Sequence, residues 1–376
     1  MRLLLMTTMG GNPWGGSEHL WCELAKTALK GQHDVFISYY RWQSKPIEIK
    51  ALEDLGIKSF KRRRINYSTL YKKPIGLLNK YLFSPLELSH LLKTSKPNHI
   101  LISMGSFSEL EIKLYQKFFN NLNIPFSLII HVNPEDRYFG FEVAKSIKVI
   151  CEKASNIFFV SKRLLEISKR QIGYDFPNGK IINNPVNMTS FSKVVYKGDK
   201  TVLNMACVGR LNTKVKGQSL LLQVLAQDKW KQRNWNLNIY GKGPDEVLLK
   251  YLCKNWNLES KVHFNGHVDD IRKDIWEKNQ VLVMPSYFEG LPLALVEAML
   301  CGRTAMSTDV GGAIEILPEK LGFFSYGVNF SAIDKAMEHL WLEKDSLLEK
   351  GELATKEINA YLNSFPNYAQ VIDSLK

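Results

Sequence analysis

Short apolar runs rich in β-branched residues alternate with longer amphipathic stretches along the whole chain, and the pattern stops and restarts near its middle. In the first series the expected strands are Arg2–Thr8, Asp34–Tyr40, His99–Met104, Phe126–Val132 and Asn156–Ser161, with helices over about Ser17–Leu29, Phe107–Asn120 and Glu135–Lys153. In the second series the expected strands are Val202–Gly209, Leu237–Gly241, Val262–Gly266, Val281–Pro285 and Thr304–Thr308. This alternation predicts parallel sheets whose strands are joined by crossover helices.

A polar segment at residues 194–200 separates the two series, and a length of 376 residues suits two domains. We therefore predict an α/β fold with two Rossmann-like, doubly wound domains whose parallel sheets face each other across a cleft. The expected domains are residues 1–195 and 196–350, followed by a helical segment, 351–376, that returns to the first domain. Ligands are expected at the carboxyl ends of the strands.

The composition excludes several classes of protein. An apolar fraction of 45% and a charged fraction of 23% are typical of ordered globular chains. No apolar run reaches the roughly 18–20 residues that cross a bilayer, and no signal peptide is evident, so a cytoplasmic protein is expected. The five cysteines are odd in number and never form a CxxC pair, which argues against disulfides and structural zinc.

The net charge of +13 lies entirely in the first half, where residues 1–195 hold 28 Lys and Arg against 15 Asp and Glu; the remainder holds 22 against 22. Such asymmetry suggests an anionic partner for the first domain, although a solvated basic loop is an equally good interpretation. The densest cluster consists of Lys58, Lys61, Arg62, Arg63, Arg64, Lys72 and Lys73, with Tyr67, Leu70 and Tyr71 among them. We hypothesise that the first domain, through the segment Lys58–Lys73, binds an anionic acceptor or the anionic membrane face that carries it, the latter giving peripheral attachment at the inner side of the membrane.

A glycine-rich loop, residues 9–18, follows the first expected strand and opens a helix. Glycines such as Gly15 and Gly16 allow a ligand to approach the backbone closely, and the helix start offers unpaired N–H groups to an anion. Ser17 is the expected N-cap. The loop matches neither the GxGxxG nor the Walker pattern, which makes a nicotinamide or P-loop site less plausible.

Two cations follow the first strand of the second series. Arg210 comes directly after Val208 and Gly209, and Lys216 precedes Gly217 and an apolar helical run. The two side chains would project from one loop at the carboxyl edge of the sheet, as suits a diphosphate. Two exposed surface cations are the plainer interpretation of these residues taken alone.

The stretch from Pro285 to Ala298 adds context to these cations. It places Glu289 and Gly290 in a turn, with Pro292 expected in the first turn of the helix that follows. The amides of that helix start can bind phosphate. Glu297 lies in an otherwise apolar run and needs a partner, either a ligand hydroxyl or a cationic side chain. Neither carboxylate should touch a diphosphate directly, because like charges repel.

These features combine with several others into a recognisable set. The set comprises Gly15-Gly16-Ser17-Glu18, Phe159-Val160-Ser161, Asn184-Pro185-Val186, Gly209-Arg210-Leu211 with Lys216-Gly217, Tyr240-Gly241-Lys242-Gly243-Pro244, Phe264-Asn265-Gly266, Glu289 to Glu297 and Gly311-Gly312-Ala313-Ile314-Glu315. With them the chain resembles the retaining glycosyltransferases of family 4, which have the GT-B fold, over most of its length. The arginine-to-lysine interval is one residue longer than the usual pattern, and Lys216 is preferred to Lys214 because Gly217 follows it.

The resemblance implies a role for each site residue. Arg210 and Lys216 would hold the donor diphosphate, Glu297 the ribose and Glu289 a hydroxyl of the donor sugar. The remaining donor contacts would come from Gly15, Gly16, Gly241, Gly266, His267, Val268, Gly290, Leu291 and Leu293. His131, at a strand end, would lie beside the reacting sugar, although a lone histidine is as readily structural. The catalytic set is then His131, Arg210, Lys216 and Glu289.

The sequence thus predicts a retaining hexosyltransferase that moves a sugar from a nucleotide diphosphate, preferably UDP-glucose, to a saccharide or lipid-linked acceptor. No cofactor and no metal are expected, because no DxD motif occurs in a suitable setting; Asp269-Asp270 resembles a helix-start cap. One alternative is a GT-B nucleotide-sugar epimerase, which needs no acceptor. A basic nucleic-acid-binding protein is another, but the clusters lack any recognisable binding layout, so no nucleic-acid partner is expected.

Overall fold

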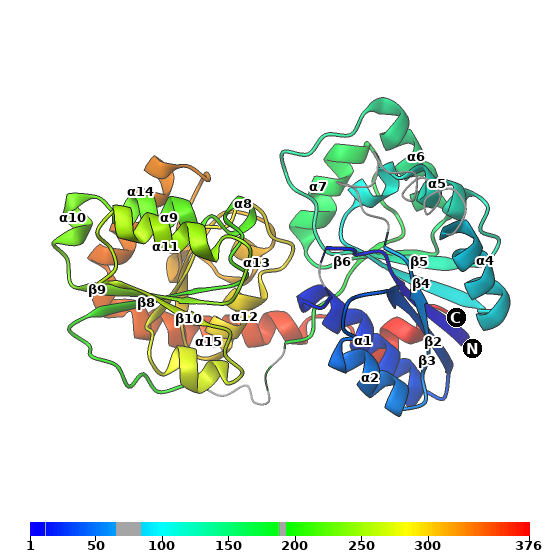
Figure 1. Cartoon of the computed structure of the whole chain (residues 1–376), viewed down its shortest axis with the longest axis horizontal. Helices are drawn as coiled ribbons and strands as arrows, with labels where there is room; N and C mark the ends of the chain where they lie inside the picture. Colours follow the sequence, from blue (N-terminus) through cyan, green and yellow to red (C-terminus); the bar gives the residue numbers. More distant parts are fainter. Residues whose placement is uncertain (12, 65–83, 187, 189–192) are drawn as a thin grey trace. The chain divides into compact units, whose positions relative to one another are not determined.

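The computed structural model describes residues 1–11, 13–64, 84–186, 188 and 193–376. The chain folds into two compact units (Figure 1). The first comprises Met1–Pro185 together with Phe365–Lys376, and the second comprises Val186–Ser364.

The first unit is built on a parallel seven-stranded sheet of order β3-β2-β1-β4-β5-β6-β7. Its strands are β1 (Arg2–Thr7), β2 (Asp34–Tyr40), β3 (Lys58–Arg62), β4 (His99–Met104), β5 (Phe126–Ile130), β6 (Asn156–Phe159) and β7 (Gly179–Ile181). The five strands predicted from sequence are all present, within two residues at each end. The two edge strands, β3 and β7, were not among the predicted strands, because they are short and partly polar.

Helices cover both faces of this sheet (Figure 1). They are α1 (Gly16–Lys30), α2 (Ile47–Asp54), α4 (Ser84–Ser95), α5 (Lys113–Asn120), α6 (Phe141–Lys153), α7 (Lys162–Ile172) and α16 (Tyr368–Asp373), with a 3₁₀ turn η2 (Phe107–Glu111). The expected helix Phe107–Asn120 is therefore interrupted at Ile112, whose backbone is extended. The predicted N-cap was wrong as well: Gly15 caps α1, and Ser17 lies inside its first turn.

The second unit repeats the same winding in a parallel six-stranded sheet of order β10-β9-β8-β11-β12-β13. Its strands are β8 (Leu203–Val208), β9 (Trp235–Tyr240), β10 (Val262–Gly266), β11 (Val281–Met284), β12 (Thr304–Thr308) and β13 (Phe323–Ser325). Only β13, a three-residue edge strand, is absent from the sequence prediction. The two sheets thus confirm the predicted fold class of two Rossmann-like, doubly wound domains.

The helices of the second unit are α8 (Thr213–Lys216), α9 (Gln218–Leu225), α10 (Asp228–Lys231), α11 (Glu246–Asn255), α12 (Leu293–Leu300), α13 (Ala313–Ile316), α14 (Phe330–Leu342) and α15 (Leu347–Asn363), with short turns η3 (Arg272–Trp276), η4 (Glu319–Leu321) and η5 (Lys344–Ser346). On one face, α9, α11 and α14 pack over a core that includes Trp230, Trp235 and Phe323. On the other, α12 packs against α15.

The division between the units falls ten residues before the predicted boundary at residue 195. The reason is that residues 193–196 bond to the second unit. The amide of Val194 donates to the carbonyl of Cys301 at 3.1 Å, and the buried guanidinium of Arg303 donates to the carbonyl of Val194 at 3.0 Å.

The C-terminal return to the first unit is shorter than the predicted segment 351–376. Helix α15 stays with the second unit, and only Phe365–Lys376 joins the first. There α16 packs against α1, and the hydroxyl of Tyr368 donates to the carbonyl of Asn183 at 3.0 Å. All five cysteines are free and buried, in agreement with the prediction from their number and spacing. Among the described residues, no helix is both long and apolar enough to cross a membrane.

Candidate active site

Both sheets reverse their strand order at one point, and ligands of doubly wound sheets bind outside the carboxyl ends of the strands at such points. In the second unit the reversal lies between β8 and β11, and in the first unit between β1 and β4. The loop carrying Arg210 and Lys216 follows β8, and the turn carrying Glu289 follows β11. The predicted donor residues of the second unit therefore gather at its switch point.

The loop after β8 is held by polar contacts that the sequence did not reveal. The buried side chain of Gln218 donates to the carbonyl of Arg210 at 2.8 Å, and Asp245 accepts from the amide of Thr213 at 2.7 Å. These bonds fix the backbone while the side chain of Arg210 is exposed to solvent. A guanidinium so placed is open to solvent and can meet a phosphate.

Gly217 joins this loop closely to the turn after β11. Its φ of +66° is left-handed, and a Cβ on it would lie 1.9 Å from the carbonyl oxygen of Pro285. The amide of Tyr287 donates to the carbonyl of Val215 at 2.8 Å across the same junction. Position 217 therefore requires glycine for two reasons: its backbone is left-handed, and there is no space for a Cβ next to Pro285.

Lys216 and Glu289 form an ion pair across this junction. The Lys216 Nζ lies 2.6 Å from Oε1 of Glu289, and the same oxygen accepts from the Ser286 hydroxyl at 2.7 Å. The Glu289 side chain is only 11% exposed and that of Lys216 26%, so solvent screens the pair weakly. Lys214, in contrast, is exposed. The geometry therefore distinguishes the two lysines and turns Lys216 toward the predicted sugar-binding carboxylate.

Helix α12 begins at Leu293 with Pro292 as its N-cap, one residue earlier than the first-turn position predicted for the proline. The loop after β12 contacts the turn that precedes α12 and fixes its backbone. There the amide of Gly312 donates to the carbonyl of Gly290 at 2.7 Å, and a Cβ on Gly311 would lie 2.4 Å from the carbonyl oxygen of Glu289. Leu291 is buried beneath the turn. The start of α12 is thus held in place and can present its amides to an anion.

Glu297 lies in the second turn of α12 and is partly buried. Desolvation raises the pKa of its carboxyl to about 7. No side-chain partner of this carboxyl is found within the described part of the chain. The unmet hydrogen-bonding capacity of such a group suits a ligand hydroxyl, as predicted for the ribose.

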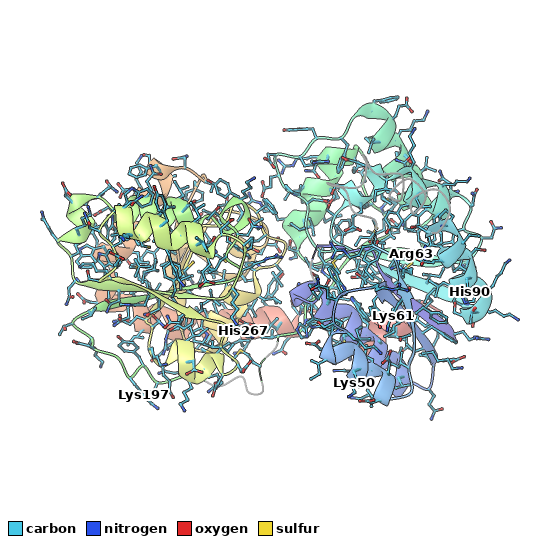
Figure 2. The ribbon with its side chains drawn as sticks, viewed as in Figure 1. Lys50, Lys61, Arg63, His90, Lys197 and His267 are labelled. Carbon is cyan, nitrogen blue, oxygen red and sulfur yellow. The ribbon has the colours of Figure 1, made fainter. Side chains whose placement is uncertain are left out.

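The remaining predicted contacts of the second unit follow β9 and β10. A Cβ on Gly241 would lie 2.0 Å from the carbonyl oxygen of Gly209, and the amide of Gly241 donates to the carbonyl of Gly266 at 2.6 Å. These glycines bring the ends of three strands together. His267 is exposed, and its ring lies next to the carboxylate of Asp269. Figure 2 labels His267, and Val268, the next residue, is half-buried.

The first unit holds the other predicted residues. Gly15 and Gly16 open α1. His131 follows β5, and its Nε2 lies 2.9 Å from the hydroxyl of Ser103, whereas its buried Nδ1 has no partner among the described residues. Burial lowers the pKa of His131 to about 3, so the imidazole is neutral. It can exchange hydrogen bonds with a ligand but brings no positive charge.

Two carboxyl groups at the switch point of the first sheet have no role assigned from the sequence: Glu18 belongs to the motif Gly15-Gly16-Ser17-Glu18, and Glu109 belongs to no motif. Desolvation raises the pKa of Glu18, on α1, to about 7. The pKa of Glu109, on η2, is also about 7, raised by desolvation and further by the nearby Glu18, although it accepts hydrogen bonds from Thr8 and from the amide of Gly105. Both glutamates lie in stretches that were expected to form amphipathic helices, where a glutamate is normally exposed, so the sequence did not indicate their burial.

The raised pKa of Glu18 predicts a pH dependence of stability. A carboxyl that ionises at about pH 7 when folded and at 4.5 when unfolded holds its proton more tightly in the native state. Its contribution is full below the unfolded pKa and is lost as pH rises toward 7. We expect the melting temperature of Glu18→Gln to fall less than that of the wild type between pH 5 and pH 8, as measured by calorimetry. The exposed Glu142→Gln is the control, and equal slopes for all three proteins would contradict the assignment.

The basic cluster is less exposed than the sequence suggested. Arg62 is 4% exposed: its Nε donates to the Ser38 hydroxyl at 2.7 Å, and its guanidinium stacks over Tyr40. The expectation that Arg62 is part of a solvated or membrane-facing surface was therefore wrong, because alternate residues of β3 turn inward. Arg63 pairs with Glu87, and Lys61 is exposed (Figure 2). The predicted membrane-binding residues Tyr67, Leu70, Tyr71, Lys72 and Lys73 lie outside the described residues.

Comparison with known proteins relates the chain to glycosyltransferases. Residues 203–342 match the family described as Glycosyl transferases group 1. An uncharacterized glycosyltransferase of Haemophilus influenzae is 26% identical over 344 residues, which cover 87% of this chain and 86% of that protein. The Campylobacter jejuni enzyme named GalNAc-alpha-(1->4)-GalNAc-alpha-(1->3)-diNAcBac-PP-undecaprenol alpha-1,4-N-acetyl-D-galactosaminyltransferase is 24% identical over 76% of this chain and 73% of its own length. Further relatives match over less than half of their own length.

Among solved structures, Anabaena HepE in complex with UDP superposes with a TM-score of 0.71 at 17% identity, covering 99% of this chain and 98% of HepE. The same protein in complex with UDP-glucose gives a TM-score of 0.70. This likeness concerns the fold, and the sequence matches concern the family. Residues 203–342 therefore resemble the group 1 glycosyltransferases in sequence, and the chain has the two Rossmann-like units of the GT-B fold.

Proposed function

We propose that the protein transfers a hexose from a uridine diphosphate sugar, with UDP-glucose as the preferred donor, to a saccharide or lipid-linked acceptor in glycan or glycolipid biosynthesis. The observation that carries the proposal is the cluster at the β8/β11 switch point, where Arg210 is exposed and Lys216 pairs with Glu289. Support for the donor comes from HepE, which has been solved with UDP-glucose. Support for a lipid-linked acceptor comes from the Campylobacter relative, whose name includes undecaprenol.

The site suits the departure of a nucleoside diphosphate. As the bond between the anomeric carbon and the diphosphate oxygen breaks, negative charge grows on that oxygen. Arg210, Lys216 and the amides at the start of α12 would stabilise this charge, and such preorganised groups supply a large part of enzymatic rate enhancement. Glu297 would accept hydrogen bonds from the ribose hydroxyls, and Glu289 from a hydroxyl of the sugar.

Retention of configuration would follow if the acceptor attacks from the face that the diphosphate leaves. The acceptor oxygen then bonds to the anomeric carbon, and its proton passes to the departing phosphate oxygen, so no enzymatic nucleophile is needed. His131 is neutral and would serve beside the sugar as a hydrogen-bonding group rather than as an acid. Gly15 and Gly16 would leave room for a phosphate beside the backbone at the start of α1.

We further propose that turnover needs neither a divalent metal nor another cofactor, since the cationic side chains and the helix start supply the electrostatic stabilisation. The test is a screen of UDP-, GDP- and ADP-hexoses with lipid-linked and free saccharides, with and without EDTA. We expect UDP-hexose turnover only when an acceptor is present, α-linked product from an α-linked donor, and unchanged rates in EDTA. Loss of turnover with EDTA and recovery with magnesium would overturn the metal-independent mechanism; product formed without acceptor would instead indicate an epimerase or hydrolase.

A further inference from the structure

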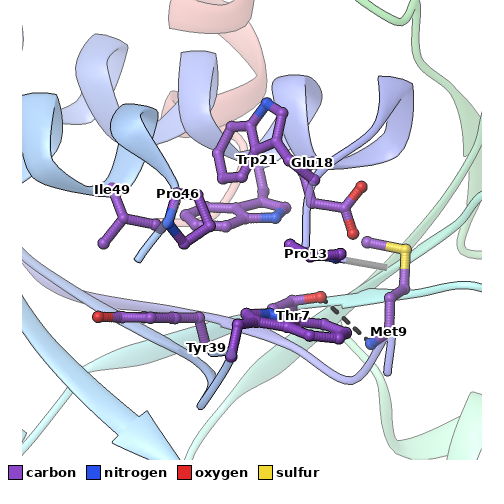
Figure 3. A pocket seen from close by; sticks show the side chains of 10 residues that line it. Thr7, Met9, Pro13, Glu18, Trp21, Tyr39, Pro46 and Ile49 are labelled. Atoms are coloured by element: carbon purple, nitrogen blue, oxygen red, sulfur yellow. Dashed lines mark hydrogen bonds between the residues drawn. The ribbon is translucent and has the colours of Figure 1, made fainter. Parts of the chain in front are cut away.

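Two strongly exposed aromatic side chains lie three residues apart at the start of helix α6. Tyr138 is 83% exposed and Phe141 77%, more than any other phenylalanine, tyrosine or tryptophan in the described part of the chain. By contrast, Trp21 and Tyr39 of the same unit are 2% and 4% exposed, and both line the small hollow between the helices and the sheet in Figure 3. Neighbouring apolar side chains left in water mark a surface that meets a partner.

The loop that carries these rings is fixed at its base and open to solvent at its tip. It joins β5 to α6 (Figure 1). At the base, Arg163 donates two hydrogen bonds to the carboxylate of Glu135, at 2.8 and 3.1 Å, and Gln171 donates to the carbonyl of Pro134 at 2.7 Å. At the tip, a Cβ on Gly140 would have no atom within 4 Å. The rings therefore project from the surface on a fixed support.

The charges around the rings are balanced. Lys145 and Lys148 follow Phe141 at intervals of four and three residues, on the exposed face of α6. Arg137 and Glu111 pair with each other at 2.5 Å. The full set of charged neighbours on this loop and helix face is Arg137, Lys145 and Lys148 against Glu111, Asp136 and Glu142.

This combination favours a lipid surface over an acidic partner. A face with equal numbers of cations and anions has no net charge with which to attract nucleic acid or an acidic protein. Exposed rings among mixed charges suit the boundary between the headgroups and the acyl chains of a bilayer, where amphipathic aromatic side chains are enriched. Such contacts give reversible attachment without a membrane-spanning helix.

The position of the loop connects this surface to the acceptor. The loop begins at His131, which would lie beside the reacting sugar in the proposed function. Tyr138 is seven residues further along, and seven residues span at most about 25 Å. A lipid-linked acceptor whose sugar lies at His131 would therefore bring the bilayer that holds its lipid close to the two rings.

We propose that Tyr138 and Phe141 insert into the bilayer surface that carries the lipid-linked acceptor and hold the first unit there reversibly. The contact is apolar and is independent of the basic segment Lys58–Lys73. The proposal rests on the proposed function, which supplies the lipid-linked acceptor, but the binding itself needs no turnover.

The test is co-sedimentation of the full chain with phosphatidylcholine vesicles at about 0.1 M and about 0.5 M NaCl. We expect similar binding at both concentrations, because salt screens contacts between exposed charges and not apolar insertion. Tyr138→Ser combined with Phe141→Ser should weaken binding by about tenfold or more, since both rings are lost. Tyr138→Trp should bind at least as tightly as the wild type, because tryptophan favours the interface. The matched control is Tyr251→Ser, a tyrosine on α11 of the second unit that is 61% exposed, and it should bind as the wild type does.

Equal vesicle binding by the wild type and the double variant would overturn the proposal. Binding that requires anionic lipid and disappears at the higher salt concentration would also overturn it, because basic residues would then provide the attachment. Analytical ultracentrifugation adds a third arm: a wild-type dimer that dissociates in the double variant would show that the rings join two copies of the chain instead. The melting temperature of each variant checks its folding, and Tyr138→Ser alone replaces the double variant if that protein is unfolded.

The two proposals fail in different ways. A chain that transfers sugar but does not bind the vesicles would contradict the insertion of Tyr138 and Phe141 and leave the transferase function standing. A chain that binds the vesicles through these rings but transfers no sugar from any nucleotide donor would contradict the proposed function instead.

Discussion

Gly217→Ala is expected to lower glycosyl transfer by about 100-fold, because misplacement of a catalytic loop by about 1 Å has an effect of that size. A Cβ at this position would lie 1.9 Å from the carbonyl oxygen of Pro285, so the loop after β8 must shift away from the turn after β11. Lys216 is the adjacent residue and would move with it. The measurement is kcat/KM for the donor together with the melting temperature.

Gly173→Ala is the matched control for this variant. Gly173 has a φ of +67°, close to the +66° of Gly217, and both residues are helix C-caps. The two substitutions therefore carry the same backbone cost, about 1 kcal/mol or slightly more. No atom lies within 4 Å of a Cβ at Gly173. If Gly173→Ala and Gly217→Ala lose activity equally, the close junction at Pro285 is not what positions the site.

Lys216→Ala is expected to reduce kcat/KM for the donor by about 10- to 100-fold, the loss of one charge-assisted hydrogen bond worth roughly 1.5–3 kcal/mol. Lys214→Ala should stay near the wild-type rate, because Lys214 is exposed and two residues away in the same short helix. Part of the loss comes from Glu289, which would lose its cation and keep the hydrogen bond from Ser286. Lys216→Ala combined with Glu289→Gln should therefore lose less than the sum of the two single effects. Strict additivity would show that the ion pair has no part in donor binding.

The sequence predicted the central strands of both sheets well because several of them, such as β4, β5 and β11, are buried throughout and appear as mainly apolar runs. It failed at the edges. Strand β3 carries Lys58, Lys61 and Arg62 and lacks such a run. Charged side chains are tolerated there because an edge strand is partly open to solvent. The sequence also does not show which of three consecutive arginines is buried. The geometry of β3 turns Arg62 into the interior, where its Nε donates to Ser38 on the neighbouring strand β2.

The sequence predicted those parts of the candidate site that lie in loops directly after recognisable strands. Gly217 and Glu289 stand out because each lies between an expected strand and the helix that follows, and the resemblance to family 4 glycosyltransferases implies their role; the switch point brings their loops together. No role was predicted for Glu18, although it is part of a recognised motif, or for Glu109. The pKa of each depends on desolvation by residues distant in sequence, and Glu109 sits on a 3₁₀ turn where the apolar period predicted a regular helix.

The central claim, that a nucleoside diphosphate binds at the switch point of the second sheet, is tested most directly by calorimetric titration of UDP into the folded wild-type chain and its variants. The account predicts that Arg210→Ala, Lys216→Ala and Glu297→Ala each weaken UDP binding, by about tenfold or more for the two cations, while Lys214→Ala binds as the wild type does. Unchanged UDP affinity in all three site variants would contradict it.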